Sequence, residues 1–328
     1  MHHRCFSYLM TPLVVTLVLF SGCKSKGLSK SVAEETVASF IAPDSVDLCF
    51  FVLGDWGRKG LHGQTELGKT MAYFAEQLNP AFIISTGDNF YPDGVESIED
   101  EHWKVSFEEP YGHQSLQTIN WYTVLGNHDI RGNVQAQMDY NQVNPSWNLP
   151  AIYYHQTVAA GEDSLLLVYL ETNSFATGYY QSDSYGPFVR AQDTTAQLAW
   201  LENLLRKHQD KPIIVFGHHP LYTAGARAGK SNSVRTHLEP RLEKYGVLAY
   251  IAGHEHDVQH INPEDKSVHH FVSGAGSALR EIKDPKAAIF AKSTNAFMVV
   301  RILGTRTYMS FIDTEGNEIY RTALESNR

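Results

Sequence analysis

Five short segments of this 328-residue chain place metal-binding side chains directly after a glycine. The segments read GDWG, GDNFY, GNHD, GHHP and GHEHD, and each follows an apolar run. They supply carboxylates, carboxamides, a phenol and imidazoles, at Asp55, Asp88, Asn89, Tyr91, Asn127, His128, Asp129, His218, His219, His254, His256 and Asp257. All of these groups are oxygen or nitrogen ligands of metal ions. If the segments converge in the fold, they form one metal site.

The apolar runs before these segments have the composition of β-strands. Runs rich in β-branched and aromatic residues cover 46–53, 81–86, 119–125, 164–171, 211–216, 247–252 and 268–274. Apolar residues at helical spacing lie over 64–79 and 193–209, the second with Asp193 as the expected cap. The stretch 296–324 alternates polar and apolar residues and turns at 315–317, which indicates antiparallel strands.

Because each of the five segments follows a strand, all five are expected at the carboxyl ends of the strands. In open sheets, ligands bind outside the carboxyl ends of the strands. A glycine there lets the chain turn sharply and lets its backbone approach a ligand. Each segment alone is more often an ordinary turn or a capping loop. Five of them in this order, each after an apolar strand, predict a single site.

Composition and charge narrow the class of protein. The chain is 43% hydrophobic and 19% charged, which is typical of a folded globular protein. Its formal net charge is −9 and it has no run rich in Lys and Arg, so we expect no nucleic-acid binding. There is no internal repeat and no change of composition after residue 45, which favours one catalytic domain over 46–328.

The N-terminus is predicted to be a targeting segment. Residues 1–22 carry Arg4 and then an apolar stretch that is shorter than the roughly 20 residues of a spanning helix. The letters FSGC end it at Cys23 and resemble a bacterial lipobox, in which the cysteine is lipidated. An ordinary secretory signal or a short membrane anchor is the alternative. Residues 23–45 are interpreted as a polar linker, so we expect an exported lipoprotein, anchored to a bacterial membrane and facing the periplasm or the cell surface.

The order GD, GDxxY, GNHD, GHxP and GHxH resembles the signature of the calcineurin-like metallophosphatases. The tyrosine of the second segment is similar to that of the purple acid phosphatases. The stretches 126–140, 147–154 and 271–277 resemble the small, tartrate-resistant branch of that family. The resemblance runs from about residue 46 to the C-terminus. It implies an α/β fold, the metallophosphatase four-layer β-sandwich of two mixed sheets flanked by helices.

The resemblance also implies a binuclear metal centre. A ferric ion would be held by Asp55, Asp88, Tyr91 and His256. A second ion, Fe²⁺, Zn²⁺ or Mn²⁺, would be held by Asp88, Asn127, His218 and His254. The donor types agree, because phenolate and carboxylate suit a trivalent ion, whereas imidazole and amide suit a borderline divalent one. Asp88 would bridge the two ions at the spacing of about 3.5–4 Å that two-metal phosphate hydrolases use.

The activity implied by the resemblance is hydrolysis of phosphate monoesters by a metal-activated hydroxide. The substrate would be a phosphorylated small molecule or a phosphoprotein. His128 would hold the phosphoryl group and protonate the leaving group, and Asp129 would orient the imidazole of His128. His219 would have a supporting role.

One loop departs from the family pattern. Mammalian members that resemble this sequence carry a further histidine after GHxP, whereas residues 221–235 contain none. Arg227, Lys230 and Arg235 lie in or near this loop instead. Arg227 or Lys230 would contact a substrate phosphate or a second anionic group, unless the loop is simply solvated.

Two other functions stay open at the level of sequence. A phosphodiesterase or nucleotidase of the same superfamily would also carry GD, GNHD and GHxH, although Tyr91 argues against it. A surface protein that keeps the fold only for binding is the alternative of a different class. The presence of every expected ligand argues against that alternative.

Overall fold

Two mixed sheets of seven strands each form the centre of the molecule. The computed structural model describes residues 27–40, 46–230 and 232–326. The first sheet has the order β14-β13-β12-β1-β2-β3-β4, with the bounds β1 Leu48–Leu53, β2 Phe82–Ser85, β3 Asn120–Thr123, β4 Trp147–Asn148, β12 Ala296–Leu303, β13 Arg306–Asp313 and β14 Glu318–Glu325. The second has the order β11-β9-β10-β8-β7-β6-β5, with the bounds β5 Tyr154–Ala160, β6 Asp163–Tyr169, β7 Ile213–Phe216, β8 Ala249–Ala252, β9 Val258–Ile261, β10 His269–Ser273 and β11 Phe290–Lys292.

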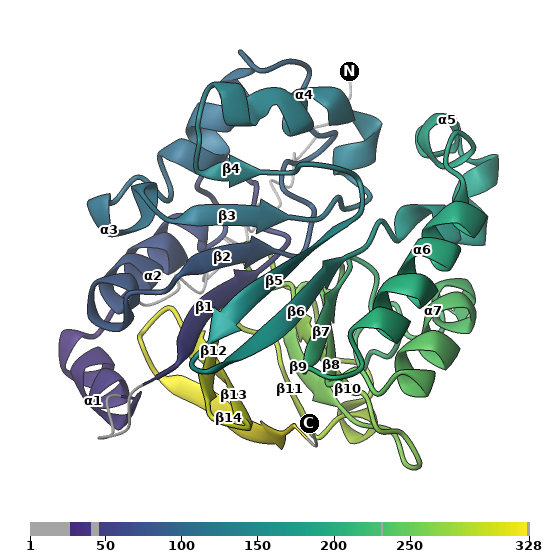
Figure 1. Ribbon diagram of the computed structural model, residues 1–328. Coiled ribbons are helices and arrows are strands. Elements are labelled where there is room, and N and C mark those ends of the chain that lie inside the picture. Colours follow the sequence, from purple (N-terminus) through teal and green to yellow (C-terminus); the bar gives the residue numbers. More distant parts are fainter. Residues whose placement is uncertain (1–26, 41–45, 231, 327–328) are drawn as a thin grey trace, which may run out of the picture.

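Three hydrophobic clusters define four layers. The inner cluster joins both sheets, with Phe50 and Ile84 of the first sheet and Leu167 and Phe271 of the second. An outer cluster packs the first sheet against α1 Lys30–Phe40 and α2 Gln64–Leu78, and it also takes in residues of α3 Gln114–Gln117 and α4 Val134–Asp139. The other outer cluster packs the second sheet against α6 Thr194–Lys207 and α7 Asn232–Lys244, while α5 Gly186–Val189 adds Val189 to the inner cluster. The four-layer α/β sandwich expected from the sequence is confirmed (Figure 1).

The strands that carry the predicted ligands are parallel within each sheet. β1, β2 and β3 pair in parallel, as do β6, β7 and β8. Their carboxyl ends therefore lie at one edge of each sheet, and the two edges meet on the same side of the sandwich (Figure 1).

Most of the elements expected from the sequence are present. All seven apolar runs contain strands, and the helices over 64–79 and 193–209 are α2 and α6. Asp193 caps α6, since its Oδ1 accepts the backbone N–H of Ala196 at 2.9 Å. The C-terminal stretch forms β12, β13 and β14 in antiparallel order.

The segment before β1 differs from the expected linker. Residues 30–40 form α1, and Ala33, Val37 and Phe40 of that helix are buried in the outer cluster of the first sheet. Arg301 of β12 donates to the backbone oxygen of Phe40 at 2.9 Å. The reason is an apolar repeat at four- and three-residue spacing, which a mostly polar segment concealed. The predicted signal peptide, residues 1–22, and Cys23 lie outside the described residues.

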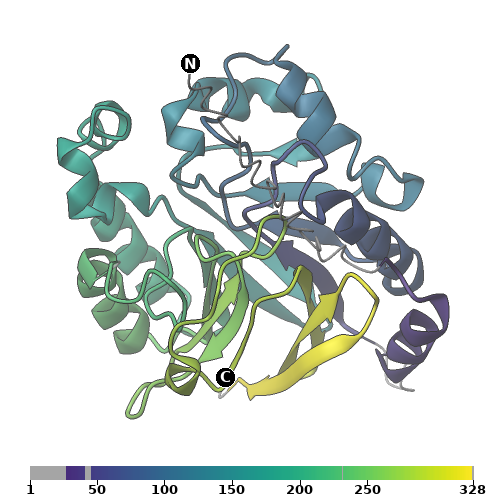
Figure 2. The same cartoon turned by 180° about the vertical axis from the view of Figure 1, so that it is seen from behind.

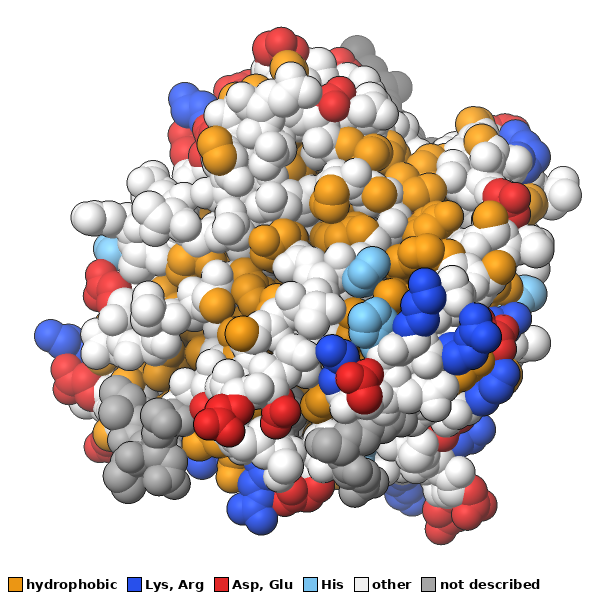
Figure 3. All heavy atoms as spheres, viewed as in Figure 1, with side chains coloured by type: hydrophobic (Ala, Val, Ile, Leu, Met, Phe, Trp, Pro, Cys, Tyr) orange, Lys and Arg blue, Asp and Glu red, His pale blue; other side chains and the backbone are white. Residues whose placement is uncertain are grey.

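The view from behind shows α1 and α2 against the first sheet and the C-terminal strands beside them (Figure 2). On the face seen in Figure 3, hydrophobic side chains gather in the upper middle, basic side chains lie beside histidines to the right of the centre, and most acidic side chains lie toward the edge. Within the described part of the chain, no helix is both long enough and apolar enough to cross a membrane.

Candidate metal centre

Backbone geometry at the strand ends directs the predicted ligands into one site. Asp55, Asp88 and His254 adopt positive φ angles of 59°, 52° and 69°, which non-glycine residues seldom do. Such strain persists only where the surrounding structure enforces it, and it clusters at functional sites. Glycine is required nearby, because a Cβ on Gly126 would lie 2.1 Å from Oδ1 of Asp88 and one on Gly253 would lie 2.5 Å from Oδ2 of Asp55.

The first predicted donor set is tightly clustered. The Tyr91 hydroxyl lies 3.0 Å from Oδ1 of Asp55 and 2.9 Å from Oδ2 of Asp88. It also lies 3.2 Å from Nε2 of His256. Nε2 of His256 is 3.5 Å from Oδ1 of Asp55. We call these four groups the first donor set.

The second predicted donor set is equally close. Nε2 of His218 lies 3.2 Å from Oδ1 of Asn127, 3.0 Å from Nδ1 of His254 and 3.4 Å from Oδ1 of Asp88. We call these four groups the second donor set. Asp88 belongs to both sets, but with different oxygens: Oδ2 faces the first set and Oδ1 the second.

These separations suit metal coordination. Ligand atoms about 2.0–2.2 Å from an ion stand about 3 Å from one another in the common geometries. Carboxylate oxygens of Asp55 and Asp88 and a ring nitrogen of His218 all lie within 4.8 Å of one another, and all three residues are buried. Two carboxylates buried together also need a cation to offset their repulsion. The residues present therefore fit a metal centre.

Burial and neighbouring charges shift the pKa values of groups in both donor sets. Burial and the charge of Asp88 raise the pKa of Asp55 well above its usual range. Burial opposes ionisation of Asp88 too, but the nearby imidazoles of His218 and His128 outweigh it and lower the pKa of Asp88. Burial lowers the pKa of His218, of His254 and, to about 2, of His256, so these rings are neutral and keep a free lone pair.

His128 lies beside both sets and does not belong to either. Its ring centroid is 4.3 Å from that of Tyr91, and its Nε2 is 3.9 Å from Oδ2 of Asp88. Its Nδ1 faces the backbone oxygen of Pro92 and the guanidinium of Arg131. Nε2 is thus left to face the site.

The structure corrects the expectation that Asp129 orients this imidazole. The Asp129 carboxylate instead accepts backbone N–H groups of Asn89, Phe90 and Gly126 at 2.7–3.2 Å. It also accepts from the side chains of Asn89 and Gln137. Asp129 therefore ties the loop after β2 to the loop after β3, and it acts on the site by position.

Three other candidate donors lie outside the two sets. The side chain of Asn89 is hydrogen-bonded to Ser85, to Asp129 and to the backbone oxygen of Val124. Oδ1 of Asp257 accepts from Gln259 at 2.7 Å. His219 has Thr172 and the Tyr179 hydroxyl at its two nitrogens, each at 3.0 Å, which agrees with a supporting role.

Arginines surround the two sets, and sequence reasoning singled out only Arg227. The guanidinium of Arg58 lies 3.5 Å from the Tyr91 ring centroid. Arg227 and Arg280 each donate to the backbone oxygen of His254 at 2.8 Å. Arg131 approaches His128. Their sequence positions could have indicated Arg58 and Arg131, since each lies three residues after a predicted site residue.

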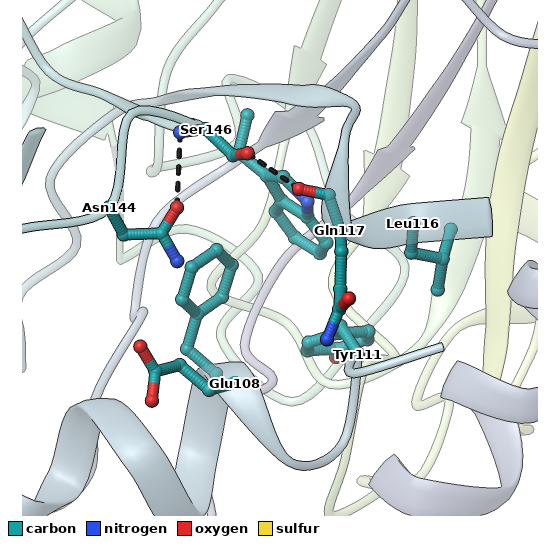
Figure 4. Close-up of a pocket in the computed structure, with 8 residues that line it drawn as sticks. Glu108, Tyr111, Leu116, Gln117, Asn144 and Ser146 are labelled. Atoms are coloured by element: carbon teal, nitrogen blue, oxygen red, sulfur yellow. Dashed lines mark hydrogen bonds between the residues drawn. The ribbon is translucent and has the colours of Figure 1, made fainter. Parts of the chain in front are cut away.

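A cavity of about 350 Å³ lies elsewhere, between the short π-helix Trp103–Glu108, α3 and the segment before β4. Figure 4 shows Glu108 and Asn144 on one side of it and Gln117 and Leu116 on the other. None of the residues that line it is a predicted ligand. It therefore plays no part in the site.

Comparison with known proteins identifies the family to which this chain belongs. Residues 49–258 match the family model of the calcineurin-like phosphoesterases. Among relatives, purple acid phosphatase 4 of Arabidopsis thaliana is 33% identical, over 96% of this chain and 93% of its own. Tartrate-resistant acid phosphatase type 5 of Homo sapiens is 30% identical, over 84% and 90%.

Among solved structures, GAP50, the anchor in the inner membrane complex of Plasmodium, has a TM-score of 0.73. It is 26% identical, over 86% of this chain and 89% of that one. The chain belongs to the purple acid phosphatases, the phosphoric monoester hydrolases of the calcineurin-like phosphoesterase superfamily.

Proposed function

We propose that the protein is an acid phosphatase with a binuclear metal centre. The first donor set would hold Fe³⁺, and the second would hold Fe²⁺, Zn²⁺ or Mn²⁺. The observation that carries this proposal is the division of Asp88, whose two oxygens face two separate donor sets. A single metal site would leave one of these buried sets without a cation.

The chain's own residues supply the rest of the chemistry. When bound, the two ions would lower the pKa of a water and neutralise charge on the phosphoryl group. Nε2 of His128 faces the site and is placed to hold the phosphoryl group and to carry a proton to the leaving oxygen. The surrounding arginines add positive charge beside the site in an acidic protein, and this charge would attract an anionic substrate.

We also propose that the protein is exported and tethered by a lipid on Cys23. The support is the sequence alone: a short apolar stretch that ends in small residues directly before the cysteine. The catalytic domain would then cover 46–328 together with the packed helix α1.

Hydrolysis of phenyl phosphate beside diphenyl phosphate, across pH and on protein that lacks residues 1–23, tests the function. We expect turnover of the monoester with an acidic optimum. A preference for the diester near neutral pH would instead indicate a phosphodiesterase. Turnover of neither substrate by the fully metal-loaded protein would favour the binding protein.

Tyr91→Phe tests the ferric assignment. We expect the oxidised protein to absorb visible light by charge transfer from phenolate to Fe³⁺, and we expect Tyr91→Phe to remove that band. The measurement is the visible spectrum together with the metal content of each protein. Tyr179→Phe, which changes a nearby tyrosine outside both donor sets, should leave the band in place. A colourless wild-type protein with two zinc ions would contradict the assignment.

A further inference from the structure

A cavity of about 290 Å³ opens beside the second donor set. Asn127 and His254 of that set line it, and so do Arg227 and Lys230 of the loop that departs from the family pattern. Because the side chain of Lys230 is exposed, the cavity extends from the buried donors to solvent. The position predicts that part of a substrate other than the reacting phosphoryl group occupies it.

Arg227 is held in a defined place between the loop and the site. Its backbone N–H donates to Oε1 of Glu255 at 2.6 Å. Its Nη1 donates to the backbone oxygen of His254 at 2.8 Å and lies 3.0 Å from Nε2 of the same residue. A half-buried guanidinium fixed in this way is already oriented for an incoming anion, which reduces the entropy lost on binding.

Lys230 adds a second positive charge at the same cavity. Its ammonium group has no hydrogen-bond or ion-pair partner among residues 27–40, 46–230 and 232–326. Arg235, the third cation of this region, differs: its guanidinium lies 4.8 Å from the Tyr222 ring centroid, and it does not line the cavity. Of these three cations, Arg227 and Lys230 therefore line the same cavity.

Aromatic rings form another wall. Tyr179 and Tyr185 are stacked, with ring centroids 4.3 Å apart at 28°, and both line the cavity. Such a wall suits a flat or ring-shaped group, because ring faces contact one another well at this spacing. The cavity thus combines a flat apolar wall with two positive charges.

We propose that this cavity is a leaving-group subsite, which selects phosphate monoesters whose alcohol portion carries a second anionic group. The proposal rests on the proposed phosphatase function and adds the class of substrate to it. The second anion, a carboxylate or another phosphate, binds Arg227 and Lys230 while the reacting phosphoryl group lies at the donor sets. The ring or chain between the two anions lies along Tyr179 and Tyr185.

A pair of substrates that differ only in charge tests this proposal. 4-Carboxyphenyl phosphate and 4-carbamoylphenyl phosphate have nearly the same shape, and the quantity to compare is their ratio of kcat/KM. We expect Lys230→Gln to lower the carboxylate-to-carboxamide ratio about threefold, as for an exposed ion pair. We expect Arg227→Gln to lower it about tenfold, as for a charged hydrogen bond. Arg235→Gln, the matched control, should leave the ratio unchanged.

The variants cancel any intrinsic difference between the two leaving groups, because each ratio is compared with that of the wild type. An equal loss on both substrates would overturn the proposal, since Arg227 and Lys230 would then serve only the shared phosphoryl group. A ratio that neither substitution changes would overturn it as well.

Calorimetric binding separates this proposal from the proposed function. The probes are 4-carboxyphenylphosphonate and 4-carbamoylphenylphosphonate, which cannot be hydrolysed. Tighter binding of the carboxylate, reduced about threefold in Lys230→Gln, supports the subsite even if the wild type hydrolyses no monoester and the phosphatase function is wrong. Equal binding of the two probes by the wild type overturns the subsite whether or not the protein is a phosphatase.

Discussion

The contact between Nδ1 of His128 and the backbone oxygen of Pro92 leaves Nε2 free for the expected role, which is to protonate the leaving group. Because Nδ1 faces the Pro92 oxygen, Nε2 is the atom that can reach a leaving oxygen. Burial lowers the pKa of His128 below its usual range, so the protonated ring that a leaving group needs forms only in acid. This is the direction that an acid phosphatase requires.

We therefore expect His128→Asn to lower kcat on phenyl phosphate by at least about 10²-fold. The loss should be clearly smaller on 4-nitrophenyl phosphate, whose phenolate leaves without a proton. Steady-state kinetics on the two substrates give the comparison, and His155→Asn, at an exposed histidine of β5, is the control. Equal losses on both substrates would assign His128 to phosphoryl binding alone.

Asp129 belongs to a metal-binding motif, but its carboxylate holds two loops of the site together. Its carboxylate satisfies three buried backbone N–H groups that a shorter side chain would leave without a partner. We expect Asp129→Ala to lower the free energy of unfolding by about 3 kcal/mol or more. Asp139→Ala, which removes an exposed hydrogen bond with Gln135, should cost far less. Urea unfolding measures both.

Kinetics then distinguish position from chemistry at Asp129. If the carboxylate only holds the two loops, Asp129→Ala lowers kcat on phenyl and 4-nitrophenyl phosphate by the same factor. A loss confined to phenyl phosphate would restore the role predicted from the sequence, because only an oriented His128 distinguishes the two leaving groups.

At the scale of elements, α1 is part of the folded domain. Phe40 is buried between α2 and β12, with its ring centroid 6.4 Å from that of Phe74 and the Arg301 guanidinium 4.2 Å from its own. We expect Phe40→Ala to cost about 3 kcal/mol of unfolding free energy, the usual loss for a large buried ring. Glu35→Ala, on the exposed face of the same helix, should change it by less than about 0.5 kcal/mol. Equal, small effects in urea unfolding would mean that 30–40 is a linker after all.

The elements that the sequence predicted are those with a continuous pattern. Strands such as β1 and β7 are buried on both faces and read as unbroken apolar runs, and α2 and α6 have long amphipathic repeats. The strand β5 was not predicted, because its buried or partly buried positions alternate with exposed ones and include the polar Gln156. The one strong turn signal beside it is Gly161, which has a φ of 64° and leads into β6. The two-residue β4 is too short to form any pattern.

The candidate site followed the same rule. The side chains predicted as ligands after a strand and a glycine do lie close together, because the strand ends converge independently of the loop conformations. The partners of Asp129 and the approach of Arg58 and Arg280 were not predictable, since they depend on how separate loops pack. Arg280, for example, reaches His254 across 26 residues of sequence.

At the scale of the whole molecule, two buried histidines of the second sheet are relevant to stability in acid, and one of them connects the two sheets. His260 of β9 has the Tyr320 hydroxyl of β14, in the other sheet, 2.6 Å from its Nδ1. His270 of β10 is buried, and neither ring nitrogen has a hydrogen-bond partner among the described residues. Burial lowers the pKa of His260 to about 3 and that of His270 to about 4. Acid should therefore destabilise the fold of a protein that we propose to be active in acid.

The sign follows from proton binding. Below an unfolded pKa of about 6.5, the unfolded chain binds protons that the buried rings refuse, so the free energy of unfolding falls with pH by up to about 1.4 kcal/mol per unit for each histidine. The fall should end near pH 4 for His270, at its folded pKa. His270→Phe, whose ring can keep the contact with Tyr222, should reduce the slope between pH 6 and 4.5 by about 1 kcal/mol per unit. Urea unfolding at a series of pH values measures this slope, with His62→Gln, at an exposed position, as the control. An unchanged slope in His270→Phe would mean that groups other than His270 set the acid limit of this fold.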